Sequence, residues 1–261
     1  MTSHNPAQNI SETNDVFYNA LWSNSFLERP ERFNTWPLIS SLLHAAPERL
    51  EIGPGLRPRL PLDGTHFIDM SASAIEKLRA GGGIAQRGEA GDLPFSDGRF
   101  DLVCAFDVVE HVGDDRKVFA ELSRVLKDDG ILIISVPLYA HFWTEFDEWA
   151  GHARRYDPAD LVSILAKNRL VTEKSAAFGM QPTNPGLVKF GMWCLKHSRN
   201  VAMFFYNRVF MPLGMYFQKR LEITNGLMDT TGVDEIVLVC RRGSRSEEIH
   251  TNTSTAVKDM A

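Results

Sequence analysis

The chain has 261 residues, of which 44% are hydrophobic and 23% are charged, an ordinary composition for a folded globular protein. Its formal net charge of -5 excludes a general nucleic-acid binder, which needs clustered positive charge for phosphate contacts. No segment in the middle has the composition of a polar linker, so we expect one large domain that carries an insertion.

The three cysteines stand far apart, and no Cys-x-x-Cys or His-rich spacing of the zinc-binding kind is present. The sequence therefore predicts no metal site, and dispersed thiols fit a reducing cytoplasm. Residues 1–12 are polar and lack the apolar stretch of a signal peptide. The tail at 244–261, rich in Ser, Thr and Glu, is expected to be disordered.

Residues 1–44 are predicted to form a helical cap. Apolar and aromatic residues recur between Val16 and Leu43, and Pro30 and Pro37 interrupt them. This pattern is typical of two or three short helices. We expect them to lie across the mouth of the domain that follows.

Two short apolar runs form the first strands. Leu50–Ile52 ends at Gly53 to Gly55, where a backbone without side chains can approach a ligand closely. Phe67–Asp69 is the second strand. Ser73 to Glu76 has the spacing of a capping box, so we expect a helix there, and Ile84–Arg87 is the third strand.

Further strands alternate with helices along the rest of the chain. Phe100–Phe106 and Ile131–Val136 are nearly continuous apolar runs, as in strands that are covered on both faces. A helix is expected over 115–127 with Gly130 closing it, and another from Asp157 onward. Two more strands are expected over 170–178 and 235–240.

This alternation predicts an α/β fold: a doubly wound, mostly parallel seven-stranded Rossmann-like sheet with helices on both faces. A helical insertion over residues 181–226 is expected before the last strand.

Six segments together resemble the class I S-adenosylmethionine-dependent methyltransferases, especially the branch with the ubiquinone and menaquinone biosynthesis methyltransferases. They are Glu51–Gly55, Asp69, Glu89–Phe95, Phe100–Val103, Asp107–His111 and Leu126–Gly130. The resemblance covers residues 45–180 and 234–243 and implies a methyltransferase domain over 45–243. These motifs say little about the acceptor.

The resemblance implies that S-adenosyl-L-methionine is the cofactor. Gly53 and Gly55 would let the backbone approach its methionine part, and Glu51 would help to hold the charged amino end. Asp69 would accept hydrogen bonds from both ribose hydroxyls. The residues implied for the adenine and the sulfonium are Met70, Glu89, Ala90 and Phe106. The sequence departs from the family where Leu56-Arg57 replace a glycine and where Glu89 replaces an aspartate.

Three titratable residues are candidates for catalysis. His111 directly follows the fourth strand, where ligands bind in open sheets, and is either a base or a support for the cofactor loop. Asp147 and His152 lie in an unusually polar and aromatic segment, 143–156, and either could take a proton from an acceptor. We expect direct displacement without a metal, in which the protein aligns the acceptor with the methyl group.

The same segment supplies most of the candidate acceptor-binding residues. Arg154, Arg155 and Tyr156 could grip an anionic or glycosyl group, with contributions from Trp143 and, in the cap, Tyr18. The alternative is a salt-bridged surface loop that orders the start of the next helix. We favour the functional interpretation, because a rigid sheet holds this loop at the expected active-site edge.

Residues 187–221 are apolar, aromatic and basic. The stretch is too short and too broken by Pro212 to span a bilayer, which needs about 20 apolar residues. Its basic residues are Lys189, Lys196, Arg199, Arg208, Lys219 and Arg220. It is either a lid over the acceptor pocket, a dimer contact, or a helix pair in contact with a membrane surface.

The leading hypothesis is a cytoplasmic S-adenosylmethionine-dependent methyltransferase, with membrane association as an option, acting on a small-molecule or lipid-linked acceptor. The alternative is a non-catalytic regulatory protein of the same fold that binds S-adenosylmethionine. A nicotinamide-dependent dehydrogenase is disfavoured, because Pro58 stands where the Gly-x-Gly-x-x-Gly pattern requires its last glycine.

Overall fold

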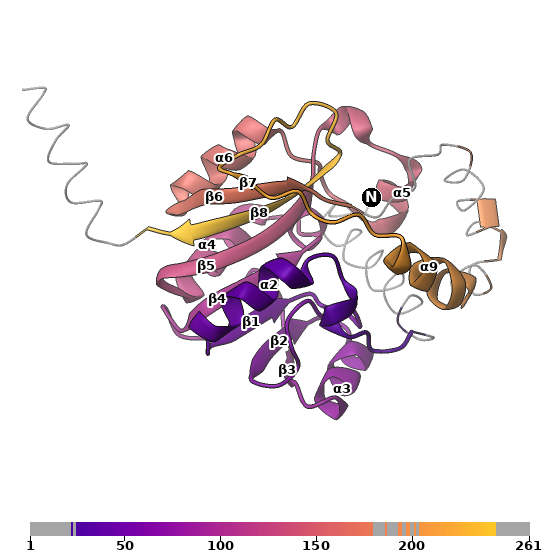
Figure 1. Ribbon diagram of the computed structural model, residues 1–261, viewed down its shortest axis with the longest axis horizontal. Helices are drawn as coiled ribbons and strands as arrows, with labels where there is room; N and C mark the ends of the chain where they lie inside the picture. Colours follow the sequence, from indigo (N-terminus) through magenta and orange to yellow (C-terminus); the bar gives the residue numbers. More distant parts are fainter. Residues whose placement is uncertain are drawn as a thin grey trace, which may run out of the picture.

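The computed structural model describes residues 22, 25–179, 186, 193–194, 197–198, 201 and 204–243. Within them the chain forms one eight-stranded sheet with helices on both faces (Figure 1). The strand order is β3 (Ile84–Arg87), β2 (Thr65–Asp69), β1 (Arg49–Ile52), β4 (Phe100–Phe106), β5 (Leu126–Pro137), β8 (Glu235–Arg242), β6 (Leu170–Ala177) and β7 (Thr224–Asn225). The predicted Rossmann-like fold is confirmed, and the additional strand is the two-residue β7 at the edge.

Strands β3, β2, β1, β4 and β5 are parallel. The chain moves outward from β1 through β2 to β3 and then returns to continue from β4 on the other side of β1. The carboxyl ends of these strands meet at one edge, and a crevice opens where the order reverses, between β1 and β4. The loops after β1, β2 and β4 therefore gather at this edge, which we call the carboxyl rim.

Strand β8 lies between β5 and β6 and runs antiparallel to both. Its side chains alternate between two apolar clusters, with Ile236, Leu238 and Cys240 on one face and Val237 and Val239 on the other. Because Glu235 pairs with Pro137 at the end of β5, the start of β8 comes to the carboxyl rim.

Each face of the sheet is covered by its own helices. Helices α4 (Asp115–Val125) and α6 (Pro158–Lys167) bury apolar residues in the larger cluster. Helix α2 (Trp36–Leu42) covers the opposite face, where α3 (Ala72–Ala80) packs on β2 and β3.

Two predicted helix boundaries are wrong. Helix α3 begins at Ala72, because Ser71 is its cap and its hydroxyl accepts a hydrogen bond from Ala74 N, so Ser73 is not the cap. Helix α4 ends at Val125, and Gly130 does not close it. Leu126 already has extended backbone and pairs with Phe100, so the polar residues after it lie in β5 next to a bulge.

Short helices complete the described part of the chain, several of them next to the carboxyl rim. They are η1 (Pro30–Arg32), η2 (Leu43–Ala45), η3 (Val109–His111), η4 (Ala140–Phe142), α5 (Glu145–Ala150), the π-helical turn η5 (Tyr206–Phe210) and α9 (Met211–Tyr216). Most of the predicted cap before Ser25, much of the predicted insertion, and the tail at 244–261 lie outside the described residues.

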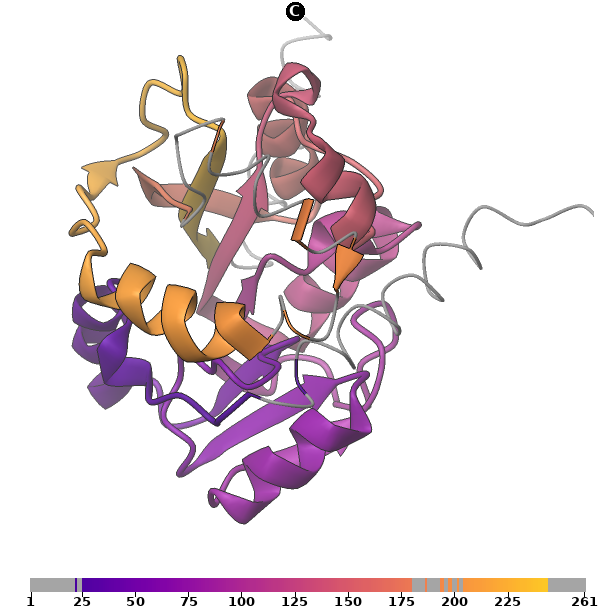
Figure 2. The ribbon, with the colours of Figure 1, turned by 90° about the vertical axis from the view of Figure 1, so that its right-hand side faces the viewer.

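Helix α9 lies beside the first described segment of the chain, as Figures 1 and 2 both show. Met211 and Met215 pack on Phe33, and Asn34 N donates to Gln218 Oε1 at 2.7 Å. The insertion therefore closes against the N-terminal segment next to the rim. No helix among the described residues has the length and apolar character needed to cross a membrane.

Candidate active site

The loop after β1 depends on two glycines at the carboxyl rim. Gly53 and Gly55 have φ of +63° and +54°, which L side chains rarely adopt. A Cβ on Gly53 would lie 2.7 Å from Val108, and one on Gly55 would lie 2.1 Å from the ring of Trp22. The two glycines thus let the backbone turn tightly and pack against Val108 and Trp22 between β1 and β4.

Glu51, in strand β1, holds this loop in place. Its side chain is buried, and its carboxylate accepts hydrogen bonds from Arg59 N at 2.8 Å and Leu60 N at 2.9 Å. Burial raises the pKa of Glu51 to about 7, although these hydrogen bonds oppose the shift. Both carboxylate oxygens therefore hold the backbone that follows the glycines, and the expected contact with the amino end of the cofactor stays a prediction.

Asp69 joins the ends of β1 and β2. One carboxylate oxygen accepts from Gly55 N and the other from Ser71 N, both at 2.8 Å. The side chain is 8% exposed. Burial raises the pKa of Asp69, although these two hydrogen bonds lower it. The predicted ribose-binding carboxylate therefore lies directly against the glycine loop.

The other residues implied for the cofactor divide into two groups. Met70 is exposed beside Asp69, and Glu89 is exposed just after β3, next to the buried Ala90. Phe106 instead packs in the apolar cluster under α2, 5.8 Å from the ring of Phe178 and 5.4 Å from the Arg59 guanidinium. The structure corrects the assignment of Phe106 to the adenine or sulfonium.

Asp147 is the centre of a buried polar network. It is fully buried and accepts hydrogen bonds from Thr144 N, His152 Nδ1, and the Nε and Nη2 atoms of Arg155. Burial alone would raise the pKa of Asp147, but the hydrogen bonds from His152 and Arg155 hold it below its ordinary value. A carboxylate so fully occupied is a poor proton acceptor, which corrects the catalytic assignment of Asp147.

Three predicted acceptor-binding residues stabilise the same segment. Arg155 is tied to Asp147, and Arg154 pairs with Asp115 at the start of α4. Tyr156 is buried and donates to Asp115 Oδ2 at 3.0 Å. These contacts favour the salt-bridged interpretation of residues 154–156. Trp143 stays 36% exposed, and Tyr18 lies outside the described residues.

The two candidate catalytic histidines do come together. The rings of His111 and His152 stand edge to face with their centroids 4.6 Å apart. Burial and the neighbouring His152 lower the pKa of His111 to about 3, so the ring is neutral near pH 7. A group with so low a pKa is a weak base for the predicted proton abstraction.

A comparison with protein families matches residues 59–134 to a family described as "Methyltransferase domain". This segment contains Asp69, the loop after β3, and β4 with the histidine that follows it. Residues 59–134 are thus similar to a methyltransferase domain, and the predicted resemblance to the S-adenosylmethionine-dependent methyltransferases is confirmed over this segment. S-adenosylmethionine is the cofactor that this resemblance implies.

Proteins similar to this chain have also been described as methyltransferases. The uncharacterized methyltransferase YcgJ of Bacillus subtilis is 30% identical over 112 residues, 42% of this chain and 44% of that protein. Its crystal structure has a TM-score of 0.52 at 17% identity and covers 80% of this chain and 98% of that chain. The dimethylglycine N-methyltransferase of Parasynechococcus marenigrum is 34% identical over 83 residues, 29% of this chain and 30% of that protein.

A third similar protein is the phosphoethanolamine N-methyltransferase 2 of Haemonchus contortus, solved with S-adenosylhomocysteine, with a TM-score of 0.52 at 14% identity. The match covers 93% of this chain and 61% of that chain. This likeness concerns the fold alone. The matches to the curated proteins span less than half of their length.

The methyltransferase domain also contains site residues that the sequence analysis left without a role. Glu110 is buried beside His111, and the guanidinium of Arg59 is buried 3.7 Å from the ring of Phe33. The sequence offered one usable signal, because Glu110 and His111 lie between valines just after the apolar strand 100–106. No comparable signal marked Arg59, since its partners are distant in the sequence.

Proposed function

We propose that the chain is a methyltransferase that moves the methyl group of S-adenosylmethionine to a small-molecule or lipid-linked acceptor by direct displacement. The supporting observation is the hydrogen bond between Asp69 and Gly55 N at the carboxyl rim of a methyltransferase domain. It brings a carboxylate suited to ribose hydroxyls against a backbone surface that a ligand can approach closely.

The chemistry requires little else from the chain. The sulfonium methyl is already activated, so the protein's task is to hold the acceptor in line with the S–CH3 bond. Alignment of this kind lowers a barrier by about 7–11 kcal/mol. The acceptor would lie near η3 and the loop after α5, where His111 and His152 meet at the rim.

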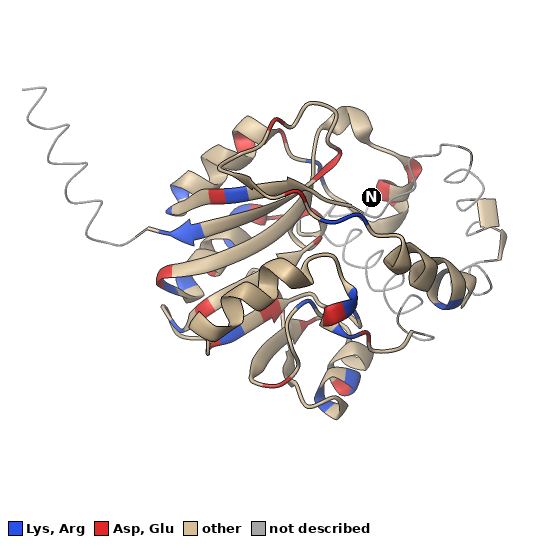
Figure 3. Cartoon of the chain, in the orientation of Figure 1, with Lys and Arg blue, Asp and Glu red and all other residues tan. Residues whose placement is uncertain are grey.

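The exposed surface of η5 and α9 supports a lipid-linked acceptor. Between 204 and 217 the exposed apolar side chains are Phe204, Phe205, Val209, Phe210, Leu213, Tyr216 and Phe217. Arg208 is the single charged residue of this stretch. Helix α9 is accordingly drawn mostly in tan, the colour of uncharged residues, in Figure 3. Arg57 Nη2 donates to Asn207 Oδ1 at 3.2 Å, which ties this surface to the glycine loop.

Calorimetric titration with S-adenosylhomocysteine tests the cofactor site. Asp69→Ala should weaken binding at least 10-fold, because the ribose loses its acceptor and Gly55 N loses its partner. The control Asp63→Ala, at an exposed position before β2, should bind as the wild type does. Equal affinity of the wild type and Asp69→Ala would show that the ribose is held elsewhere.

Formation of S-adenosylhomocysteine from S-adenosylmethionine then separates the two functions. A methyltransferase forms it faster in the presence of a lipid-linked or small acceptor. A protein that binds the cofactor tightly but never forms the product, over a panel of oxygen, nitrogen and carbon acceptors, would be the non-catalytic alternative.

A further inference from the structure

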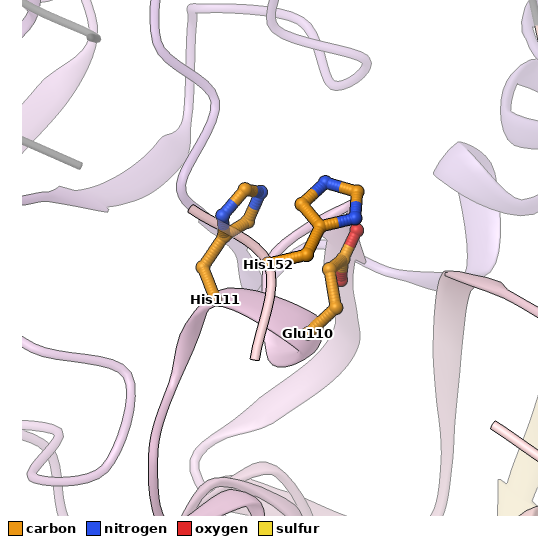
Figure 4. Close-up of side chains that lie close together, drawn as sticks. All are labelled: Glu110, His111 and His152. Carbon is orange, nitrogen blue, oxygen red and sulfur yellow. The ribbon is translucent and has the colours of Figure 1, made fainter. Parts of the chain in front are cut away.

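Glu110, His111 and His152 form a compact cluster at the rim of the methyltransferase domain. Their potential ligand atoms, one from each side chain, all lie within 4.8 Å of one another. Figure 4 shows Glu110 and His111 rising from η3 while His152 reaches them from the loop after α5. Two distant parts of the chain therefore bring a carboxylate and two imidazoles together.

One oxygen of the Glu110 carboxylate has no hydrogen-bond partner among the described residues. Glu110 is 1% exposed, and among the described residues no group hydrogen-bonds its Oε2 atom. An unsatisfied carboxylate oxygen in a buried position is costly, so it requires either a proton or a cation. A cation bound between Glu110 and the two rings would satisfy it.

Both imidazoles are oriented by oxygen atoms that can only accept hydrogen bonds. His152 Nδ1 lies 2.9 Å from Asp147 Oδ1, and His111 Nδ1 lies 3.4 Å from the carbonyl oxygen of Gly151. Hydrogen bonds to these oxygens require a proton on Nδ1, and in a neutral ring this leaves the lone pair on Nε2. This is the arrangement of metal-binding histidines, in which a carboxylate or carbonyl fixes the tautomer of the ligand.

Asp147 is itself held by Arg155 and Thr144, so the His152 ring is positioned by a rigid, buried network. We propose that Glu110, His111 and His152 bind a divalent transition-metal ion, with Zn²⁺ as a well-matched case. Two imidazole nitrogens and one carboxylate oxygen are a donor set that Zn²⁺ and Fe²⁺ both accept. Ligand atoms around a tetrahedral Zn²⁺ lie about 3.4 Å apart, which small side-chain rotations reach from the present separations.

A site with three protein ligands keeps a position open for a further oxygen ligand. The use of that position rests on the proposed function: an acceptor hydroxyl bound there would lose its proton to solvent water more readily. The C–O bond to the methyl group then forms as the C–S bond breaks, and the electron pair of that bond stays on sulfur. The site thus predicts an oxygen acceptor.

Metal binding is testable without cofactor or acceptor, so its failure is distinct from failure of the methyltransferase assignment. Chelator-treated protein should take up one equivalent of Zn²⁺ in a calorimetric titration. Glu110→Gln and His152→Gln should each weaken Zn²⁺ binding at least 10-fold. The matched control His141→Gln, at an exposed histidine of η4, should bind as the wild type does.

Two further measurements guard against variants that fold poorly. Zn²⁺ should raise the thermal midpoint of the wild type and of His141→Gln, but not that of the two ligand variants. Co²⁺ bound to the wild type should show d–d absorption bands without sulfur-to-metal charge transfer, since the proposed ligands carry no sulfur. The proposal would be overturned if Zn²⁺ did not bind stoichiometrically or if all variants bound it with equal affinity. A sulfur-to-metal charge-transfer band would also overturn it.

Discussion

The ion pair between Asp147 and Arg155 makes a sharp quantitative prediction. Their side chains are 0% and 3% exposed, and Arg155 Nε lies 2.8 Å from Asp147 Oδ1. Asp147→Asn removes the charge but keeps the shape, so Arg155 is left as a buried cation without a counter-ion. Breaking a buried pair in this way costs about 3–5 kcal/mol of unfolding free energy.

The companion change removes both charges. In Asp147→Asn/Arg155→Met the buried cation is gone, so the double variant should be more stable than Asp147→Asn alone, although Leu138 and Asp234 lose hydrogen bonds from Arg155. Unfolding in urea, followed by circular dichroism with linear extrapolation, measures both values. An exposed control, Asp63→Asn, should stay within about 0.5 kcal/mol of the wild type.

The reasoning would be refuted if Asp147→Asn cost less than about 1 kcal/mol, far below the range for a broken buried pair. It would equally fail if the effects of the two substitutions were simply additive. A catalytic base at Asp147 predicts the opposite pattern, with activity lost and stability unchanged. The experiment therefore separates the catalytic assignment made from the sequence from the network seen in the structure.

Three further outcomes are expected. Gly55→Ala should cost about 1–2 kcal/mol of stability for its left-handed backbone and should also displace Trp22, seen as altered tryptophan fluorescence and weaker binding of S-adenosylhomocysteine. The pKa of Glu51 in the folded protein, about 7, lies above its ordinary value of 4.5. The free energy of unfolding of the wild type, measured relative to Glu51→Gln, should therefore fall as pH rises between these two values. Denaturant titrations should show a fall of up to about 1.4 kcal/mol per pH unit. The protein should co-sediment with anionic vesicles at low salt, and Phe210→Ser/Phe217→Ser should reduce this binding.

Each of these predictions has a control. Gly226→Ala carries a comparable φ of +71° with nothing within 4 Å, so it should lose stability but leave cofactor binding intact. A relative stability of Glu51→Gln that does not change with pH would contradict the raised pKa. Equal sedimentation with neutral and anionic vesicles, or no effect of the double substitution, would leave only the lid or dimer interpretation of the insertion.

The cofactor half of the site was predictable because its signals are local. A strand that ends in two glycines must turn with positive φ, and a carboxylate at the end of the next parallel strand must arrive beside it. Gly55 and Asp69 follow this logic, and their 2.8 Å contact agrees with it. Phe106 failed because a strand residue can face either side of the sheet, and the sequence did not indicate which side held the ligand.

The acceptor half was predicted less well, because several roles are open to the same residue types. Arg154, Arg155 and Tyr156 could bind an anion, but in the folded protein their side chains already pair with Asp115 and Asp147. Whether an arginine binds a substrate or a neighbouring carboxylate depends on which acid the fold brings near it. Spacing along the chain does not carry that information.

The sequence by itself determined the α/β fold class, the glycine loop and the resemblance to the methyltransferases, because apolar runs and turn residues act over a few neighbouring positions. Only the tertiary structure decided how the polar groups are paired. It brought Glu110 close to His152 across a long stretch of chain, and among the described residues it left the Oε2 atom of Glu110 without a hydrogen-bond partner. Ion pairs and metal sites form between side chains that folding brings together from distant parts of the chain. Their partners are therefore set by how the helices pack on the sheet, and spacing along the sequence does not reveal them.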